Sequence, residues 1–202
     1  MTSRRHFVFL TQVYPPDPAA VGQHLADAAE ELARRGHKVS VFTADRGFDD
    51  PSMKFVSREH RSGVDVRRLP FGSFGKSSIV ARVASGIVLM FQELAHGLAV
   101  ADLDTVVVTT SPPVGPMAGV VLSALKDATL KYWVMDVNPD QMVALGKLRS
   151  DSVLARVFGW MNGIALKRAS AIIVLDRMMA RLIEKKANVA NRMTVVRPWA
   201  AD

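Results

Sequence analysis

Short apolar runs that are typical of buried strands alternate with helix-like stretches along most of this 202-residue chain. His6 to Val13 is a continuous apolar run with β-branched and aromatic members, and a second strand is predicted at Lys38 to Thr43. Between them, apolar and charged residues recur at the spacing of an amphipathic helix from Val21 to Leu32. Because parallel strands require right-handed crossovers, this alternation predicts an α/β fold. We expect a doubly wound, mostly parallel sheet of about seven strands with helices on both faces.

The same reading extends to the end of the sequence. Further strands are predicted at Val64 to Leu69, Thr105 to Thr110, Leu130 to Met135, Ala171 to Leu175 and Met193 to Val196. Further helices are predicted at about Ser77 to Leu98, Val114 to Lys126, Ser152 to Arg168 and Arg177 to Lys186. No internal repeat or Ser/Gly-rich linker interrupts the pattern, so residues 1–197 are predicted to form one domain and residues 198–202 to begin a linker.

Charge and cysteine content exclude several classes of protein. The net charge of +7 favours anionic partners, but aromatic residues make up only 7% and lie mainly in the strand-like runs, so we expect no nucleic-acid binding. The absence of cysteine excludes disulfides, thiolate zinc sites and iron–sulfur clusters, and makes the cytoplasm the expected compartment. The five histidines lack metal-ligand spacing, so no metal site and no cofactor is predicted.

Three loops that follow predicted strands carry the candidate functional residues. In open parallel sheets, ligands bind beyond the carboxyl ends of the strands. The first loop leads to Gly22, which lets an anion or a sugar approach free N–H groups of the helix start, or else serves tight strand–helix packing. Asp136 and Asn138 stand at the end of a central strand, where they are suited to bond sugar hydroxyls or to accept a proton. The alternative is an Asx-type turn before Pro139.

Three other motifs resemble known sites but lack a feature that those sites require. Gly72 to Ser77 ends like a phosphate-binding loop, but Pro70 stands where its first glycine belongs. Asp45 ends a strand where dinucleotide-binding proteins keep an acid, yet the first turn lacks their glycines. Asp102 and Asp104 resemble the acid pair of metal-dependent sugar transferases but precede their strand, at the wrong edge of the sheet.

Taken together, the loops resemble the amino-terminal domain of the family-4 glycosyltransferases of the GT-B fold, especially the bacterial branch that builds surface polysaccharides. The stretches that carry this resemblance are Val13-Tyr14-Pro15-Pro16 with Gly22, residues 37–43, Thr110-Ser111-Pro112-Pro113, residues 136–146 and Val195-Val196-Arg197-Pro198-Trp199. Residues 137 and 138 depart from the family, because Val-Asn replaces the common Leu-Trp.

The resemblance implies transfer of a sugar from a nucleotide-sugar donor to a lipid-linked or saccharide acceptor, without a metal. It implies a catalytic role for Asp136 and contact of Gly22 with the donor diphosphate. The acceptor-binding residues it implies are Tyr14, Gln23, His24, Thr110, Ser111, Asn138 and Asp140.

The family's donor-binding carboxyl-terminal domain, with its paired glutamates, has no counterpart in these 202 residues. We therefore expect an acceptor-binding half that is inactive alone. The alternatives are a non-catalytic nucleotide- or saccharide-binding module, or a subunit that needs a separate donor-binding chain.

The most apolar stretch, Ile79 to Ala101, contains Arg82, Gln92, Glu93 and His96, so we expect no membrane span. An apolar helix face with basic flanks predicts peripheral contact with an anionic membrane at its inner surface, whereas packing against the sheet is the alternative. The residues of this face and its flanks are Lys76, Ile79, Arg82, Val83, Ile87, Met90 and Phe91.

Overall fold

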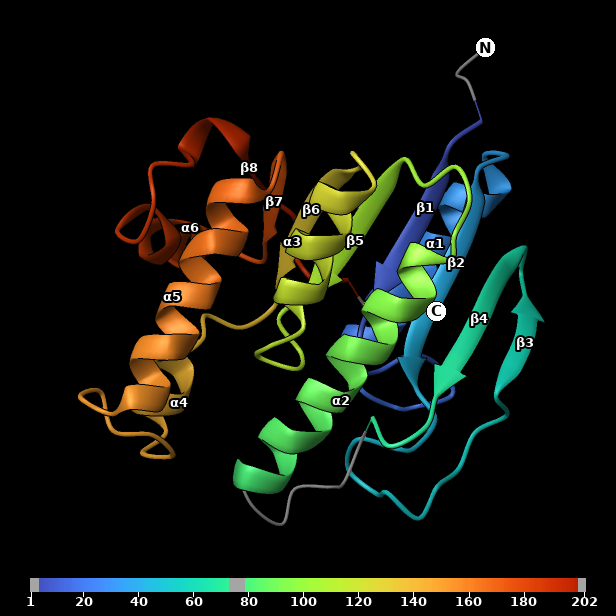
Figure 1. Cartoon of the computed structure of the whole chain (residues 1–202). Coiled ribbons are helices and arrows are strands. Elements are labelled where there is room, and N and C mark those ends of the chain that lie inside the picture. The colour runs from blue at the N-terminus through green and yellow to red at the C-terminus, as the bar shows by residue number, and fades with distance from the viewer. Residues whose placement is uncertain (1–3, 73–78, 200–202) are drawn as a thin grey trace.

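The computed structural model describes residues 4–72 and 79–199. In this part of the chain, eight strands form one sheet in the order β3-β4-β2-β1-β5-β6-β7-β8 (Figure 1). The strands are β1 (His6–Leu10), β2 (Lys38–Ala44), β3 (Arg58–Arg61), β4 (Val64–Leu69), β5 (Thr105–Thr109), β6 (Thr129–Val134), β7 (Ala171–Val174) and β8 (Met193–Val195). All of them pair in parallel except β3, which runs antiparallel to β4. The predicted fold class is therefore confirmed.

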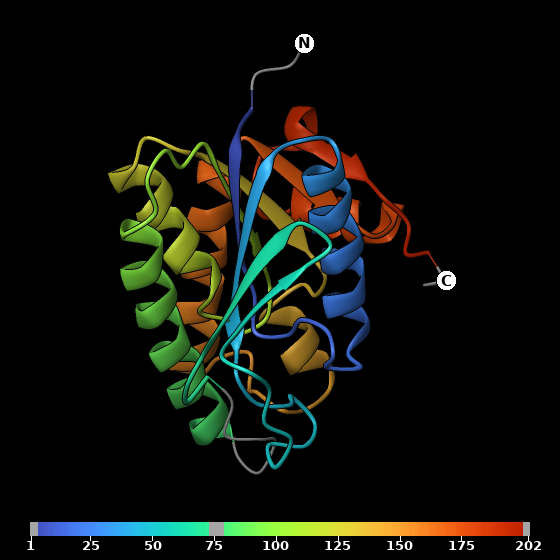
Figure 2. The ribbon, with the colours of Figure 1, turned by 90° about the vertical axis from the view of Figure 1, so that its right-hand side faces the viewer.

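Helices cover both faces of the sheet. They are α1 (Ala20–Arg34), α2 (Ile79–Leu98), α3 (Pro116–Leu125), α4 (Asp140–Ala144), α5 (Val153–Arg168) and α6 (Arg177–Glu184). Figure 2 shows α1 on one side of the sheet and α2, α3 and α5 on the other. The hydrophobic core is divided accordingly, because alternate strand residues point to opposite faces. Leu10 belongs to the cluster beneath α2 and α3, whereas Phe9 belongs to the cluster beneath α1.

The edge strand β3 was not among the predicted strands. Its sequence, Arg58 to Arg61, is charged throughout and carries none of the apolar alternation that indicates a strand. Charged side chains are typical of edge strands, where they discourage pairing with another chain. The prediction of about seven strands thus missed the one strand whose position is fixed by backbone pairing with β4 rather than by burial.

Most predicted strands run one to three residues too far at their carboxyl ends. The largest error is in β1, which ends at Leu10 although the apolar run continues to Val13. Residues 11–13 are buried like the strand itself, so their sequence does not show where pairing stops. At Gln12 the backbone N–H already bonds the carbonyl of Ser111, which lies in the loop after β5.

A glycine terminates helix α1. Gly36 adopts a left-handed φ of 88°, and the N–H of His37 reaches back to the carbonyl of Leu32. This termination turns the chain directly into β2 beside β1. The phosphate-loop-like segment falls largely on residues 73–77, and those residues, like 200–202 of the predicted linker, lie outside the described part of the chain.

Candidate functional site at the carboxyl ends of the strands

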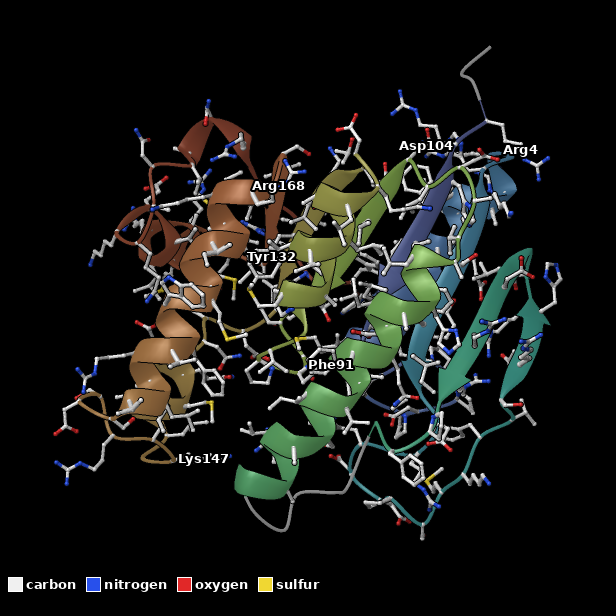
Figure 3. All side chains as sticks on the ribbon, in the orientation of Figure 1. Arg4, Phe91, Asp104, Tyr132, Lys147 and Arg168 are labelled. Carbon is white, nitrogen blue, oxygen red and sulfur yellow. The ribbon has the colours of Figure 1, made fainter. Side chains whose placement is uncertain are left out.

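The strand order reverses at β1, which has β2 on one side and β5 on the other. In open α/β sheets such a switch point opens a crevice beyond the carboxyl ends of the two diverging strands. All three cis X-Pro bonds of the described chain, at Pro16, Pro112 and Pro139, lie in the loops at this edge. Figure 3 marks the two ends of the sheet: Asp104 lies at the amino edge and Lys147 at the carboxyl edge.

Gln12 joins three of the strand-end loops. Its N–H donates to the carbonyl of Ser111 at 3.1 Å, and its Oε1 accepts a bond from the Ser111 hydroxyl at 3.2 Å. Its Nε2 donates to the carbonyl of Gly72 at 2.9 Å. The side chain is almost fully buried, so these bonds replace its contacts with water and hold the loops after β1, β4 and β5 in one arrangement.

Thr110 holds the neighbouring loop after β6. Its hydroxyl oxygen accepts bonds from the N–H groups of Met135 and Asp136, at 3.3 and 3.0 Å. The Asp136 carboxylate is half-buried, and its Oδ1 accepts a bond from Nε2 of Gln141 at 2.7 Å. No other hydrogen bond to this carboxylate is formed by the described residues, which leaves Oδ2 available to a ligand.

A hollow of about 90 Å³, here named the strand-end hollow, opens between these loops and the amino-terminal part of α2. It is lined by Phe48, Arg82, Thr110, Ser111, Pro113, Asp136, Asn138, Gln141, Met142, Leu145 and Lys147. Four predicted site residues are therefore brought together: Thr110, Ser111, Asp136 and Asn138. Two cations that the sequence did not assign to this site, Arg82 and Lys147, line it as well.

The remaining predicted site residues do not line the strand-end hollow. Tyr14 is buried on the α1 side, where burial raises the pKa of its hydroxyl above the ordinary value. The ring of His24 packs against Trp199, with 4.6 Å between the ring centroids. Gln23 is half-buried on the same helix. Asp140 forms an ion pair with Lys186 at 2.6 Å. Their predicted roles in acceptor binding stay predictions.

Gly22 lies against the loop that precedes α1. A Cβ at this position would stand 3.1 Å from the Cα of Tyr14, tighter than nine in ten real Cβ contacts. The geometry therefore supports the packing role of Gly22, and its contact with a donor diphosphate stays a prediction.

The turn from Asp136 to Pro139 is held by groups other than an Asx bond. The backbone N–H of Asn138 donates to the carbonyl of Asp136 at 3.1 Å. The Asn138 carbonyl accepts a bond from Asn162 of α5, whose Oδ1 in turn accepts from the hydroxyl of Tyr132 (labelled in Figure 3). The backbone and α5 thus shape the loop. Within the described chain, the side chains of Asp136 and Asn138 accept no hydrogen bond from the N–H groups of this turn.

Two positioning residues were missed from the sequence. The guanidinium of Arg68 is buried and donates to the carbonyls of Pro15 and Val56 and to the carboxylate of Glu59, at 2.7, 3.0 and 2.9 Å. Arg68 occupies an inward position of β4, two residues after buried Val66, and this position in the alternation was the available signal.

The other missed residue is Asp17, which joins the loops after β1 and β2. One carboxylate oxygen accepts from the N–H of Ala19 at 3.0 Å and the other from the N–H of Phe48 at 2.7 Å. Since Phe48 lines the strand-end hollow, Asp17 helps to define its wall. The signal in the sequence was the position of this acid between two prolines, Pro16 and Pro18.

Two further expectations concern metals and membranes. Within residues 4–72 and 79–199, no group of three or more His, Asp or Glu side chains is arranged to hold a metal ion. No helix in the same part of the chain is long and apolar enough to cross a membrane.

Asp104 precedes β5 and accepts a bond from the N–H of His6 at 2.7 Å, so the Asp102–Asp104 pair lies at the amino edge, as expected.

An open, mostly parallel sheet with polar loops gathered at its switch point defines a Rossmann-like half of the GT-B fold. The chain matches the family described as "Glycosyl transferase 4-like domain" over residues 19–199. It therefore belongs to this family. A search of curated proteins finds no match.

Proposed function

We propose that this chain is the acceptor-binding half of a glycosyltransferase of bacterial cell-envelope polysaccharide synthesis. The reaction moves a sugar from a nucleotide-sugar donor to a lipid-linked or saccharide acceptor. The observation that carries the proposal is the strand-end hollow, in which the free oxygen of Asp136 faces the same space as Ser111 and two cations.

In this proposal Asp136 accepts the proton of the acceptor hydroxyl as that oxygen forms the new glycosidic bond. The bond between the donor sugar and its diphosphate breaks in the same reaction, and the diphosphate leaves with the electron pair. A carboxylate is suited to this role because it accepts directional hydrogen bonds and can hold the released proton. The hydroxyl of Ser111 and the amide of Asn138 orient the acceptor by bonds to its other hydroxyls.

Arg82 and Lys147 give the strand-end hollow a second function. A lipid-linked acceptor carries phosphate next to its sugar, and guanidinium and ammonium groups bind phosphate strongly. We assign the two cations to this phosphate, so that the sugar hydroxyl is presented to Asp136. Burial of the leaving diphosphate in a closed cleft needs a second wall, which we assign to a donor-binding domain in the same or a separate polypeptide.

The test is a transfer assay with the 202-residue chain, a panel of nucleotide sugars and lipid-linked acceptors, with and without a donor-binding domain. We expect no product from the chain alone, and turnover with the second domain that Asp136→Asn lowers at least about a hundredfold. Asp102→Asn is the matched control, because Asp102 lies at the opposite edge with a left-handed φ of 51° that asparagine tolerates. Robust turnover by the single chain would refute the two-wall requirement. Full activity of Asp136→Asn would refute the assignment of the base, and saccharide binding without turnover in any pairing would favour a binding module.

Peripheral contact with the cytoplasmic face of the membrane is part of the same proposal. On α2, Val83 and Met90 pack into core clusters, as the packed-helix alternative expected, whereas Ile87 and Phe91 are 39% and 61% exposed. Phe91 is labelled in Figure 3. Lys76 and the side chain of Ile79 lie outside the described residues. We assign the exposed pair of Ile87 and Phe91 to contact with lipid, and the net charge of +7 favours an anionic surface; Arg82, which lines the strand-end hollow, is not part of this face.

Vesicle flotation tests the membrane contact. We expect the chain to float with vesicles of phosphatidylglycerol and not with neutral ones, and Phe91→Ser to abolish flotation. Leu125→Ser is the control, since Leu125 is 65% exposed at the end of α3. Absence of binding to either vesicle, or equal losses in the two variants, would end this part of the proposal.

A further inference from the structure

A second and larger cavity lies away from the strand-end hollow. It measures about 750 Å³ and is lined by residues of β2, β4 and β3 and by residues at the carboxyl-terminal end of α2. In Figure 1, α2 lies on this side of the sheet. The lining of the cavity includes no residue of the strand-end hollow. We name it the β4 groove. Its volume falls within the range of small-molecule sites.

The register of the edge hairpin places two guanidinium groups side by side in the β4 groove. Arg58 of β3 is directly opposite Arg67 of β4, and both line the groove. Like charges at directly opposed positions of antiparallel strands destabilise the pair. Among the described residues, no carboxylate lies within ion-pair distance of either guanidinium. The hairpin therefore holds two guanidinium groups side by side with no carboxylate in direct ion-pair contact with either.

His96 of α2 lies close to the same two arginines. Its Nδ1 accepts a bond from Nη1 of Arg67 at 2.9 Å, so this ring nitrogen carries a lone pair. Burial lowers the pKa of His96, and the charges of Arg67 and Arg58 lower it further. Neither the imidazole of His96 nor the ammonium group of Lys38, which also lines the groove, can carry a negative charge.

Beside the arginines, a row of polar groups crosses the sheet. Ser40 of β2, Asp65 of β4 and His60 of β3 stand opposite one another in register. Nδ1 of His60 lies 2.9 Å from the Asp65 carboxylate, and Nε2 of His6 lies 3.0 Å from the Ser40 hydroxyl. The Asp65 side chain is 63% exposed, so one of its oxygens remains open to a ligand. Carboxylate and hydroxyl groups in a row are suited to bond vicinal hydroxyls.

We propose that the β4 groove binds a phosphorylated sugar or polyol. The phosphate lies between Arg58 and Arg67, and the hydroxyls bond the row of Ser40, Asp65 and His60. The guanidinium fork matches phosphate oxygens in bidentate geometry, and the bound anion removes the repulsion between the two arginines. This site is separate from the acceptor site proposed above.

Isothermal titration of the 202-residue chain with glucose 6-phosphate tests this site. We expect saturable binding that Arg58→Gln with Arg67→Gln weakens about tenfold or more. Arg61→Gln is the matched control: it lies on the same strand but points to the other face, where it pairs with Glu30 of α1. The control removes one charge from β3 without touching the groove, so it leaves the affinity unchanged. Glucose and inorganic phosphate each bind more weakly than the sugar phosphate.

Four results would overturn the inference. They are absence of saturable binding, equal weakening by Arg61→Gln, binding of inorganic phosphate as tight as that of glucose 6-phosphate, and binding of phosphatidylglycerol vesicles that is lost in Arg58→Gln with Arg67→Gln but kept in Phe91→Ser. Arg58→Gln alone keeps the test decisive if loss of the half-buried Arg67 disturbs folding, because Arg58 is exposed. The titration is then followed by NMR, and the backbone amide signals of residues around position 58 must shift in the parent chain and not in Arg58→Gln.

Discussion

Glu93 is a carboxyl group in the core, and its ionisation links the stability of the fold to pH. The side chain is fully buried on α2, and neither carboxyl oxygen forms a hydrogen bond with the described residues. Burial raises its pKa well above the ordinary value of 4.5. The backbone N–H of Thr11 favours the charged form and opposes this shift, but it is already bonded to the carbonyl of Phe42 at 3.1 Å. We therefore expect Glu93 to be protonated in the folded protein well above pH 4.5.

The magnitude follows from the proton linkage. Below pH 4.5 both folded and unfolded chains hold the proton, so Glu93 adds no pH dependence. Above pH 4.5 the unfolded chain releases a proton that the folded chain retains, and the free energy of unfolding falls by about 1.4 kcal/mol per pH unit. The decline continues until the pH reaches the raised pKa of the folded state. Glu93→Gln has no proton to lose and does not show this decline.

The assay is urea unfolding followed by circular dichroism at pH 5, 6 and 7, with the parent chain and Glu93→Gln compared at each pH. We expect the stability of the variant relative to the parent to rise by about 1.4 kcal/mol between pH 5 and 6. Other titrating groups cancel in this comparison, and the fixed cost of burying an amide changes only the offset. Glu184→Gln, on the exposed end of α6, is the control and gives a flat difference. A flat difference for Glu93→Gln as well would refute the reasoning.

Three further substitutions test the contacts around the site. Arg68→Met breaks a buried ion pair and leaves two carbonyls without a donor, so it should lower the free energy of unfolding by about 3 kcal/mol in urea titrations; a loss below about 1 kcal/mol would contradict this. Gly22→Ala should lower the free energy of unfolding by about 1–3 kcal/mol through overpacking. Gly163→Ala, with nothing within 4 Å of its added Cβ, should raise it by about 0.5–1 kcal/mol. Effects of equal sign would count against the packing role of Gly22. Trp199→Ala should lower the stability measured by thermal unfolding by about 1 kcal/mol, because its ring contact with His24 and its hydrogen bond to Asp27 of α1 are lost. The Trp160 side chain is 65% exposed, so Trp160→Ala should change the stability very little. The reverse order would contradict the packing of Trp199 on α1.

The layout of the sheet could be predicted because its strands are buried on one or both faces. Apolar runs such as Thr105 to Thr109 are recognisable as strands in the sequence, and the helices between such runs favour parallel pairing. The same logic brought Thr110 and Asp136 together, since both directly follow central strands. By contrast, β3 and the five-residue helix α4 are held by pairing and by local turns, and these leave little periodicity in a sequence.

The cations of the site show where sequence reasoning ends. Arg82 comes from α2 and Lys147 from the loop after α4, and only the packing of these segments brings both to the strand-end hollow. The sequence instead placed Arg82 beside a helix face that could contact a membrane, because its neighbours on the helix are apolar. In the same way the opposition of Arg58 and Arg67 follows from the register of the edge hairpin, which no local pattern specifies.

The central claim is that acceptor sugars bind in the strand-end hollow, and an NMR titration of the isotope-labelled chain tests it most directly. With a diphosphate-linked saccharide as the probe, we expect the largest backbone shifts at Ser111, Asp136 and Lys147, and about tenfold weaker binding by Asp136→Asn. Shifts confined to other parts of the chain, or unchanged binding by Asp136→Asn beside the Asp102→Asn control, would contradict the account.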